Sequence, residues 1–406
     1  MPQYSTLEKL FYSDSSSDRF ADHERRKIER LNHESTFRTG IALENGELFL
    51  AIPHELSLAS EQILRRERRV SALWHALPVI ALSAFMRSLV LDEVVYSNGI
   101  EGVHSTRREV EAALEAHKDD QHIPFVEFAH LYLQLEDNPQ PPSSLADIRS
   151  IYDAVVAGTL APNDLLGAST FRTGPVKIIN HMGHTVHSGV LPNAIEPMME
   201  QWLTLSRDES IPELYSAALC HFLFEYIHPF YDGNGRTGRY LLALHLSRPL
   251  SQPTALSLSR TIAENKSAYY KAFDVTERPL NAAEGTHFVL AVLDMITQAQ
   301  EGLIADLEQK RALLERLHTR IDELSAVMST RACDALFFAA QIHLFGAFRE
   351  TRLAELASYL HVSTPTARKT ISQLEQDGIV QKIAARPPTY QLTPAGLELL
   401  RLEGDR

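Results

Sequence analysis

The sequence predicts a mainly α-helical fold that ends in a small α/β module, and three observations support this prediction. After Pro53 the chain is dominated by helical patterns. The strand-like segments are short and cover residues 47–52, 171–187 and 380–392. The residues after 328 differ in character from the rest, because short helical and strand-like segments alternate there. The bulk of the fold should therefore be helical.

The composition is that of an ordinary globular protein. The chain has 406 residues, of which 44% are hydrophobic and 22% charged. At roughly 100–200 residues per domain, this length corresponds to two or three domains. The formal net charge of -13 excludes nucleic-acid binding over the whole surface, so any contact with DNA must be local.

Cysteine use and apolar runs indicate a cellular compartment. Cys220 and Cys333 are the two cysteines, and both lie in apolar sequence, which predicts no disulfide framework and a reducing environment. The first twenty residues lack the apolar core of a signal peptide. The longest apolar stretch, residues 73–86, is too short to span a bilayer. We expect a cytoplasmic protein that makes no contact with membranes.

The first half of the chain contains few strong punctuation signals. Residues 11–46 are polar with weak periodicity and predict an irregular leader, and residues 47–52 predict a short strand. The Pro-rich residues 138–142 predict a connector between helical stretches. Residues 171–187 are rich in β-branched side chains around a turn at residues 181–184, which predicts a hairpin.

Residues 298–324 predict a long charged helix with a narrow apolar seam. The seam residues recur at 3-4-3 spacing and are Leu314, Leu317, Ile321 and Leu324. Such a seam packs either on its own domain or on a second copy of the chain. We expect a homodimer on the second interpretation.

The segment that carries chemistry begins with an apolar helix. Residues 215–227 are apolar nearly all round, which predicts a buried helix. Pro229 disfavours helical geometry at His228, so the helix should end there with the imidazole at the mouth of a loop. Residues 232–235 all tolerate positive φ and could turn backbone N–H groups inward as an anion nest. A second helix, predicted from about Arg236, adds its N-terminal dipole.

The side chains of this loop suit a polyphosphate. Arg236 and Arg239 are three apart on one helix face and supply forked donors for phosphate oxygens. Asp232 supplies a hard oxygen ligand for Mg²⁺ beside phosphates. His228 can act as a general base near neutral pH. A helix C-terminus nevertheless favours the charged imidazolium, which is the wrong form for a base.

One alternative interpretation of the loop is a dinucleotide-binding turn. Residues 233–238 satisfy the G-x-G-x-x-G spacing of such folds. That pattern requires a preceding strand and an acidic residue about 20 residues further on. The preceding segment is helical in pattern, and residues 250–260 contain no acid. The sequence therefore disfavours this interpretation.

Residues 228–239 resemble the signature of the Fic family, H-x-F-x-[DE]-G-N-G-R-x-x-R, with every specified position present. The resemblance implies a protein adenylyltransferase that moves AMP from ATP to a protein hydroxyl. It assigns His228 as the base that deprotonates the target hydroxyl and Asp232 as the Mg²⁺ ligand. It further assigns phosphate contacts to the rest of the loop, namely Gly233, Asn234, Gly235, Arg236, Thr237, Gly238 and Arg239.

Two further segments are similar to parts of that family. Residues 170–192 look like its flap, a hairpin that receives the target segment by strand addition. The segment with Asn265 and Tyr270 resembles a helix that borders the adenine, where Asn265 would bond the base and Tyr270 would stack on it. The alternative readings are an ordinary surface hairpin and a pair of core tyrosines, Tyr269 and Tyr270.

Residues 97–102 match the inhibitory motif of the family, [ST]-x-x-x-E-[GN]. Ser97 suits the N-cap of a short helix, and Glu101 lies four residues later on the same face. The resemblance implies that Glu101 pairs with Arg239 and occupies the site of the γ-phosphate. In some relatives the same Glu assists AMP removal, so the enzyme could run in both directions. The alternative is an ordinary capped helix with a solvated Glu.

The C-terminal residues resemble a winged helix-turn-helix. A helix over residues 352–360, a second helix with a stripe of Ala367, Ile371 and Leu374, and two strands around residues 386–388 follow in that order. Such a module would direct several side chains to DNA: Thr364, Thr366, Arg368 and Lys369 to a major groove and Arg386 to phosphates. Winged helices also dock proteins, and both interpretations stay open.

The predicted domains are residues 1–105 with the inhibitory helix, 106–296 as the Fic catalytic domain, 297–328 as a linker helix and 329–406 as the winged helix-turn-helix. The implied cofactors are ATP and Mg²⁺, and the implied partner is a protein with a hydroxyl side chain, which could be the chain itself. Two other functions compete with adenylyl transfer. One is a DNA-binding regulator whose Fic domain senses nucleotide, and the other is transfer of UMP, phosphocholine or phosphate.

Overall fold

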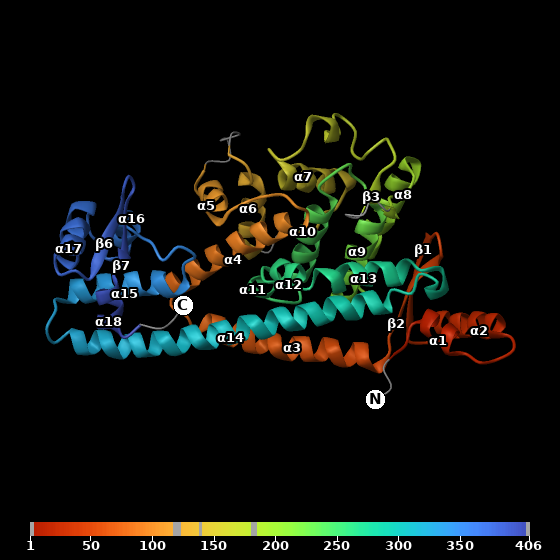
Figure 1. The fold of residues 1–406 in the computed structure, drawn as a ribbon, viewed down its shortest axis with the longest axis horizontal. Coiled ribbons are helices and arrows are strands. Elements are labelled where there is room, and N and C mark those ends of the chain that lie inside the picture. The colour runs from red at the N-terminus through yellow and green to blue at the C-terminus, as the bar shows by residue number, and fades with distance from the viewer. Residues whose placement is uncertain (1–3, 117–122, 138–139, 180–184, 403–406) are drawn as a thin grey trace. The chain divides into compact units, whose positions relative to one another are not determined.

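The computed structural model describes residues 4–116, 123–137, 140–179 and 185–402. The fold is mainly helical, as predicted (Figure 1). The chain divides into two compact units. Unit 1 comprises Met1–Arg68 and Asp92–Glu301, and unit 2 comprises Arg69–Leu91 and Gly302–Arg406.

Most helices belong to unit 1. They are α1 (Leu7–Ser13), α2 (Arg19–Leu31), α5 (Arg107–Glu115), α6 (Val126–Leu133), α7 (Leu145–Val156), α8 (Pro192–Leu205), α9 (Glu213–Ile227), α10 (Asn234–Leu246), α11 (Gln252–Ala255), α12 (Leu258–Glu264) and α13 (Lys266–Glu277), with 3₁₀ turns η1 (Gln134–Asp137), η2 (Pro162–Asp164) and η3 (Pro279–Asn281). The helices that contribute to both units are α3 (His54–His75), α4 (Val79–Ile100) and α14 (Thr286–Leu324). Those of unit 2 are α15 (Thr330–Phe345), α16 (Leu353–Tyr359), α17 (Thr364–Gln376) and α18 (Pro394–Leu400).

Within the described residues, the strands form three small antiparallel sheets. They are β1 (Thr36–Leu43) with β2 (Gly46–Ala51), β3 (Lys177–Ile179) with β4 (Thr185–Ser188), and β5 (Thr351–Arg352), β6 (Val380–Ala385) and β7 (Pro388–Leu392) in the order β5-β7-β6. The strand predicted over residues 47–52 is β2, and the strands predicted within residues 171–187 are β3 and β4. The turn predicted at residues 181–184 lies outside the described residues.

The predicted irregular leader over residues 11–46 is wrong, because this segment holds the end of α1 and the whole of α2 and β1. Helix α2 begins at a capping contact in which Asp18 accepts a hydrogen bond from the backbone of Ala21 at 3.2 Å. None of its residues is buried. Helix α2 is nevertheless strongly amphipathic, so a helical period was present in the sequence and the prediction missed it.

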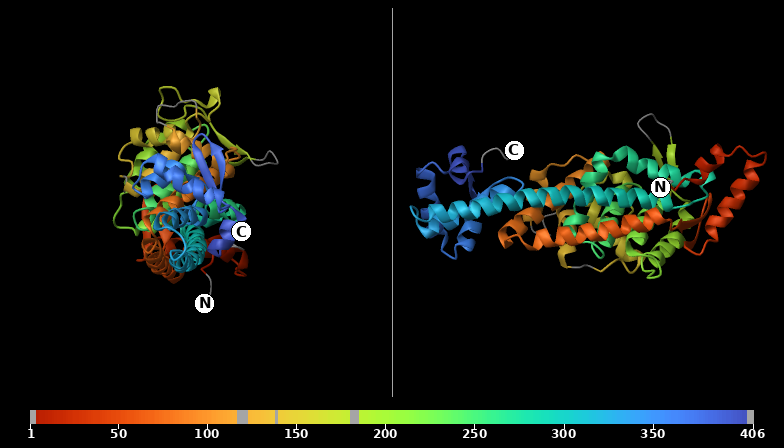
Figure 2. Two further views of the ribbon diagram at one scale, coloured as in Figure 1. Left: turned by 90° about the vertical axis from the view of Figure 1, so that its left-hand side faces the viewer. Right: turned by 90° about the horizontal axis from the view of Figure 1, so that it is seen from below.

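The core of unit 1 is built around α9 and α10. Helix α9 is apolar nearly all round, as predicted, and Phe222 and Phe224 are completely buried. The Trp202 indole of α8 donates to the carbonyl of Cys220 at 2.7 Å, which fixes α8 against α9. Cys220 and Cys333 are both buried and free, so the prediction of no disulfide is confirmed. In this unit the first part of α3 also runs beside the first part of α14 (Figures 1 and 2).

A buried carboxyl anchors the later part of α4. Glu93 is 1% exposed and accepts hydrogen bonds from the Ser259 backbone at 3.0 Å and from the Tyr132 hydroxyl at 3.3 Å. Burial raises the pKa of Glu93 to about 7, against the hydrogen bonds that lower it. These contacts fix the helix one turn before Ser97, so they position the residues at its C-terminal end.

Unit 2 has its own apolar core, and the predicted seam contributes to it. Leu314, Leu317 and Leu324 are buried, and Ile321 packs against the same cluster. The seam therefore packs within its own unit rather than being left for a second copy. The predicted order of helix, turn, helix and two strands is present as α16, α17, β6 and β7, and Ala367, Ile371 and Leu374 are buried as the stripe predicts.

Helix α14 is long, and one of its 18-residue windows is apolar enough to cross a membrane by length and composition alone. Half of that window is buried inside the protein. Phe288, Leu293 and Ile296 are among the buried residues of this helix. A core helix passes the same test, and packing of these side chains accounts for the apolar character of α14.

Candidate active site

The loop of residues 228–239, here called the motif loop, starts where α9 ends. His228 is the C-cap of α9 and adopts the left-handed conformation, with φ 51° and ψ 62°. Its N–H still donates to the Phe224 carbonyl at 3.0 Å. Pro229 follows, so the predicted helix end at His228 is confirmed. The imidazole thus stands at the mouth of the loop.

The anion nest that residues 232–235 could form is not present as such. Only Gly233 is left-handed, with φ 81°, while Asn234 and Gly235 already belong to the first turn of α10. The helix therefore starts two residues before the predicted Arg236. An anion would meet the free N–H groups of a helix N-terminus at this place, rather than a separate nest.

Two side chains of the motif loop are used to hold its shape. The Asn234 amide accepts from the backbone N–H of Phe230 and donates to the carbonyl of Phe230, both at 2.9 Å. The Thr237 hydroxyl donates to the Gly233 carbonyl at 2.9 Å. Both residues are buried. Asn234 and Thr237 therefore leave only their backbone groups for a ligand.

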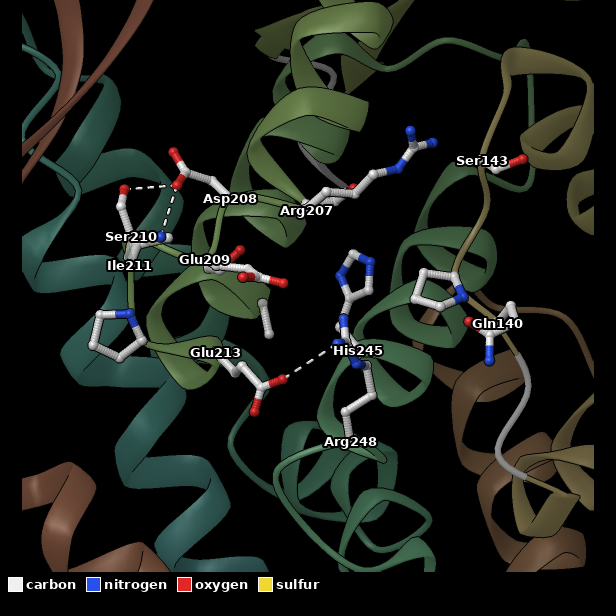
Figure 3. Close-up of a pocket in the computed structure, with 15 residues that line it drawn as sticks. Gln140, Ser143, Arg207, Asp208, Glu209, Ser210, Ile211, Glu213, His245 and Arg248 are labelled. Carbon is white, nitrogen blue, oxygen red and sulfur yellow. Dashed lines mark hydrogen bonds and ion pairs between the residues drawn. The ribbon is translucent and has the colours of Figure 1, made fainter.

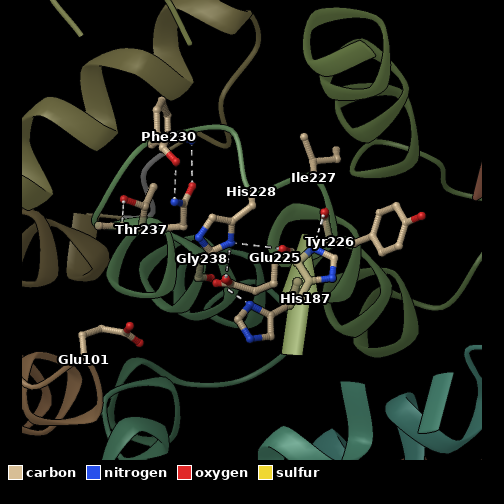
Figure 4. Close-up of polar contacts among 12 residues, drawn as sticks. Glu101, His187, Glu225, Tyr226, Ile227, His228, Phe230, Thr237 and Gly238 are labelled. Atoms are coloured by element: carbon tan, nitrogen blue, oxygen red, sulfur yellow. Dashed lines mark hydrogen bonds and ion pairs between the residues drawn. The ribbon is translucent and has the colours of Figure 1, made fainter. Parts of the chain in front are cut away.

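The environment of His228 favours the neutral imidazole. Its Nδ1 lies 3.3 Å from the Glu225 carbonyl, which places the proton on Nδ1 and leaves Nε2 as an acceptor (Figure 4). Burial, with help from the neighbouring His187, lowers the pKa of His228 to about 4. Burial thus outweighs the helix C-terminus, which favours the imidazolium. The imidazole of His228 is therefore neutral at neutral pH.

Arg236 is a buried cation with free donors. The side chain is 0% exposed, and Nη1 donates to the Thr159 hydroxyl at 2.8 Å. Its Nε and Nη2 have no hydrogen-bond partner among the described residues. The Asp232 carboxylate, whose side chain is 52% exposed, lies 3.8 Å from Nη2. Two nitrogens without a partner on a buried guanidinium fit an anionic ligand, because leaving their N–H groups unpaired is costly.

Arg239 is held by the end of α4. Its Nη1 donates to Glu101 Oε1 at 2.7 Å, its Nε to the Ser97 hydroxyl at 3.0 Å and its Nη2 to the Ser97 carbonyl at 2.7 Å. Burial alone would raise the pKa of Glu101, but the charges of Arg239 and Arg236 lower it on balance, so the carboxylate is ionised. A Cβ at Gly235 would collide with Glu101 Oε1.

The predicted N-cap role of Ser97 is wrong, because Ser97 lies in the last turn of the 22-residue helix α4. Glu101 follows directly after that helix ends. The two residues nevertheless lie on one face, as their four-residue spacing predicts. The family resemblance predicted the contact between Glu101 and Arg239, whereas the contacts of Ser97 with Arg239 and the length of the helix were not predicted.

Glu225 is a buried carboxyl that the sequence analysis did not single out. Its Oε2 lies 3.9 Å from His228 Nδ1, and its Oε1 is buried without a hydrogen-bond partner among the described residues. Burial and the charge of Glu101 raise the pKa of Glu225 to about 8. A Cβ at Gly238 would collide with Oε1. A lone acid near the end of an otherwise apolar helix was the available signal.

Of the two residues predicted to contact adenine, Tyr270 is exposed and Asn265 is already hydrogen-bonded within the protein. Tyr270 is 45% exposed, with Lys266 Nζ 5.8 Å from its ring centre, whereas Tyr269 is buried and bonds His221 Nε2 at 2.7 Å. The tyrosines are thus not both core residues. The Asn265 amide already donates to the Thr261 carbonyl at 3.0 Å and to Gln298 at 3.1 Å. Only its oxygen is left for a base.

A hollow that is separate from the motif loop lies elsewhere in unit 1 (Figure 3). It has a volume of about 1050 Å³, and its lining includes Arg207, His245 and Arg248. It shares no residue with the motif loop. No cluster of three or more His, Cys, Asp or Glu side chains that could hold a metal occurs in the described part of the chain.

Residues 142–246 match the Fic/DOC family model, so the chain contains a Fic domain. It is 25% identical over 277 residues to a protein of Drosophila grimshawi named protein adenylyltransferase Fic, which covers 65% of this chain and 49% of that protein. The protein of that name from Drosophila virilis is 27% identical over 201 residues, covering 47% and 38%. The chain thus matches half or less of the length of these curated relatives.

A solved structure shows the same fold. The crystal structure of a Fic family protein from Desulfovibrio desulfuricans G20 aligns with a TM-score of 0.52 and 20% identity, and covers 84% of this chain and 97% of that chain. At this identity the likeness describes the fold alone. The motif loop, residues 228–239, lies inside the matched family region.

Proposed function

We propose that this chain is a protein adenylyltransferase that transfers AMP from ATP to a Ser, Thr or Tyr hydroxyl of a target protein, and that Glu101 holds it inactive. The observation that carries the proposal is the motif loop itself. It combines a neutral imidazole, a buried guanidinium with free donors and a second guanidinium held by a carboxylate. The Fic domain and the names of its relatives support the same activity.

The chemistry follows from the position of each group. Nε2 of His228 takes the proton of the target hydroxyl, whose oxygen attacks the α-phosphorus of ATP. The bond from the α-phosphorus to the bridging oxygen breaks, and pyrophosphate leaves. Arg236, with the N-terminal N–H groups of α10, stabilises the negative charge of the phosphates. Gly233 and Gly235 let the backbone approach them closely.

Mg²⁺ fits the residues present. Asp232 is the exposed carboxylate of the motif loop, and Mg²⁺ beside phosphates usually takes one or two protein carboxylates, with waters and phosphate oxygens as its other ligands. Bound there, the ion would neutralise phosphate charge. Asp232 also accepts the backbone N–H of Gly233 at 2.6 Å, which orients its carboxylate.

The inhibited state follows from competition for Arg239. With Glu101 bound at 2.7 Å, the Arg239 guanidinium is not free to clamp the γ-phosphate. Displacement of Glu101 would free Nη1, while the two bonds to Ser97 keep the side chain aligned. The same Glu101, beside a bound AMP-protein, could assist AMP removal, and we propose that both directions are open.

We assign the recognition of the target protein and of the adenine ring to the elements beside the motif loop. The β3–β4 pair would act as the flap that receives the target segment as an added strand. Tyr270 would stack on adenine, since its ring is half exposed. Asn265 is the weaker candidate, because its amide N–H groups are already engaged.

A second candidate function is a DNA-binding regulator whose Fic domain senses nucleotide. The observation in its favour is α17, where Thr364, Arg368 and Lys369 are exposed. Together with β6 and β7, α17 would form the winged helix-turn-helix of residues 329–406. A gel shift that weakens with salt and with Arg368→Ala would support this function. Failure to bind duplex DNA at low salt would reject it.

The remaining assignments are proposals of the same kind. The inhibitory region would cover residues 1–105, the catalytic domain residues 106–296 and the linker helix residues 297–328. We further propose a cytoplasmic homodimer, whose contact would lie outside the α14 seam because that seam packs within unit 2. Light scattering of the purified chain tests the dimer, and a monomer at working concentration would refute it.

The decisive experiment uses α-labelled ATP and Mg²⁺ with the wild type, Glu101→Gly and Glu101→Gly with His228→Ala. We expect weak self-labelling, strong labelling and none, in that order. Equal labelling in all three would refute both the catalytic and the inhibitory assignments. Labelling from γ-labelled but not α-labelled ATP would indicate phosphate transfer. Preferential labelling from α-labelled UTP would show that the transferred group is UMP rather than AMP.

A further inference from the structure

Arg172 is a buried arginine whose contacts are all carbonyl oxygens. It is 2% exposed. Its Nε donates to the His228 carbonyl at 2.7 Å, its Nη1 to the Gly174 carbonyl at 2.7 Å and its Nη2 to the carbonyls of Val190 at 2.6 Å and Ile227 at 3.3 Å. Its backbone N–H also donates to the Pro229 carbonyl at 3.0 Å. No carboxylate of the described residues forms an ion pair with this side chain.

The acceptors belong to two different parts of the site. Ile227 and His228 end α9, and their carbonyls form part of the negative end of that helix. Gly174 and Val190 flank the β3–β4 pair on either side. One planar guanidinium with five donors can satisfy all of these carbonyls at once, whereas a lysine could reach one or two.

The space around the guanidinium is closed. A Cβ at Gly189 would collide with Arg172 Nη2 and with Val176. A second side chain links the same two segments, because the Tyr231 hydroxyl accepts hydrogen bonds from the backbone N–H groups of Thr173 at 3.2 Å and Gly174 at 2.9 Å. The segment that leads into β3 is thus attached to the motif loop by two side chains.

The backbone at His228 needs such support. Residues other than glycine rarely adopt the left-handed conformation, and they keep it only where contacts with the surrounding structure stabilise it. His228 is such a residue. The contacts of Arg172 fall on the carbonyls of Ile227, His228 and Pro229. They therefore fix the peptide planes on both sides of the turn that aims the imidazole.

We propose that Arg172 is a positioning residue that locks the left-handed turn of His228 to the base of the β3–β4 pair. This inference rests on the proposed adenylyl transfer. If the β3–β4 pair receives the target segment, the Arg172 guanidinium sets the distance between that segment and the His228 imidazole. Its loss should lower the rate of transfer and leave ATP binding at Arg236 and Arg239 intact.

The electrostatic environment offers a second readout. Burial is the main cause of the low pKa of His228, and the charges of His187 and Arg172 lower it further, while Glu101 opposes them. Removing the Arg172 charge should therefore raise the pKa of His228. Replacement by Lys keeps the charge and loses most of the contacts, so it separates geometry from charge.

The test uses the full-length chain with Glu101→Gly as parent. Arg172→Met should lower kcat by about 100-fold, the loss expected for a base misplaced by about 1 Å, with KM for ATP within about twofold. The acid limb of the pH profile should move to higher pH. Arg172→Lys should also lower kcat, but leave that limb in place. Arg30→Met is the matched control, since Arg30 is a largely buried arginine paired with Glu284, and it should lower the melting temperature without lowering kcat.

A folded Arg172→Met with kcat within about threefold of the parent would overturn the proposal, as would a loss confined to KM for ATP. If Arg172→Met does not fold, Arg172→Lys decides by the same criteria. If the parent transfers no label, the proposed function fails. NMR titration of the His228 imidazole then tests the role of Arg172, because an unchanged pKa in folded Arg172→Met, or an unchanged chemical shift in both folded Arg172 variants, would refute it.

Discussion

Competition between ATP and Glu101 for Arg239 can be tested with a nearly isosteric change, Glu101→Gln. Arg239 is 2% exposed and makes three contacts, of which the two to Ser97 remain in this variant. The third, at 2.7 Å, joins two charges. Such a charge-assisted bond is worth about 1.5–3 kcal/mol when buried.

The exposure of the carboxylate reduces this figure. The Glu101 side chain keeps 30% of its surface exposed, so solvent screens part of the attraction. We therefore assign about 1–2 kcal/mol to the charge attraction between Glu101 and Arg239. ATP must overcome this free energy in the wild type, and the neutral side chain of Glu101→Gln no longer supplies it. At 1.4 kcal/mol per factor of ten, this corresponds to roughly 5- to 30-fold tighter productive ATP binding.

The assay measures ATP affinity by calorimetry and the initial rate of transfer from α-labelled ATP. Both should rise in Glu101→Gln by the factor above, at unchanged fold. Glu24→Gln serves as control, because Glu24 pairs with Lys27 on the exposed helix α2 and should change neither quantity. Unchanged or weaker ATP binding in Glu101→Gln would refute the reasoning.

Four further predictions follow from the same site. The acid limb of kcat/KM should fall near pH 4, because His228 must be neutral to act as base and is protonated as the pH drops through its pKa of about 4; a limb near pH 6.5 in the rate profile would contradict this. Gly238→Ala should lower stability by about 1–3 kcal/mol in denaturant titrations, since a Cβ meets the Glu225 carboxyl. Asp232→Asn should raise the Mg²⁺ concentration for half-maximal labelling by about tenfold or more, because it removes a charged ligand. Burial lowers the pKa of His187, but the bond to Glu277 raises it on balance. The wild type should therefore exceed His187→Gln in stability by its full margin below about pH 6.5, and melting curves should show this margin shrinking at higher pH.

The sequence predicted the motif loop well because its signals are local. A proline after His228 ends a helix, and a glycine such as Gly233 permits a left-handed turn, whatever the rest of the chain does. The loop therefore lies close to where the pattern placed it. The start of α10 differed by two residues, since Asn234 is helical and uses its side chain to bond Phe230.

Long-range features were harder to predict. The contact between Glu101 and Arg239 joins residues 138 positions apart, and it was expected only through a family resemblance. The resemblance predicted a short helix that starts at Ser97, whereas Ser97 lies in the last turn of the longer helix α4 and Glu101 follows directly after it. The buried contacts of Glu93 hold this part of α4 in place. Arg172 was seen only as part of a hairpin pattern, since nothing in its neighbourhood in sequence reveals carbonyls that come from α9.

Two glycines of the motif loop show how packing explains what backbone preference does not. Gly235 and Gly238 lie inside α10 with helical backbones, so positive φ is not the reason for glycine at either place. A Cβ at the first would collide with Glu101 and at the second with Glu225. Each glycine thus makes room for a carboxyl: one that holds Arg239, and one that lies beneath His228. After burial, the charge of Glu101 is the largest cause that raises the pKa of Glu225, so displacing Glu101 should also make Glu225 more acidic and place a negative charge closer to the base.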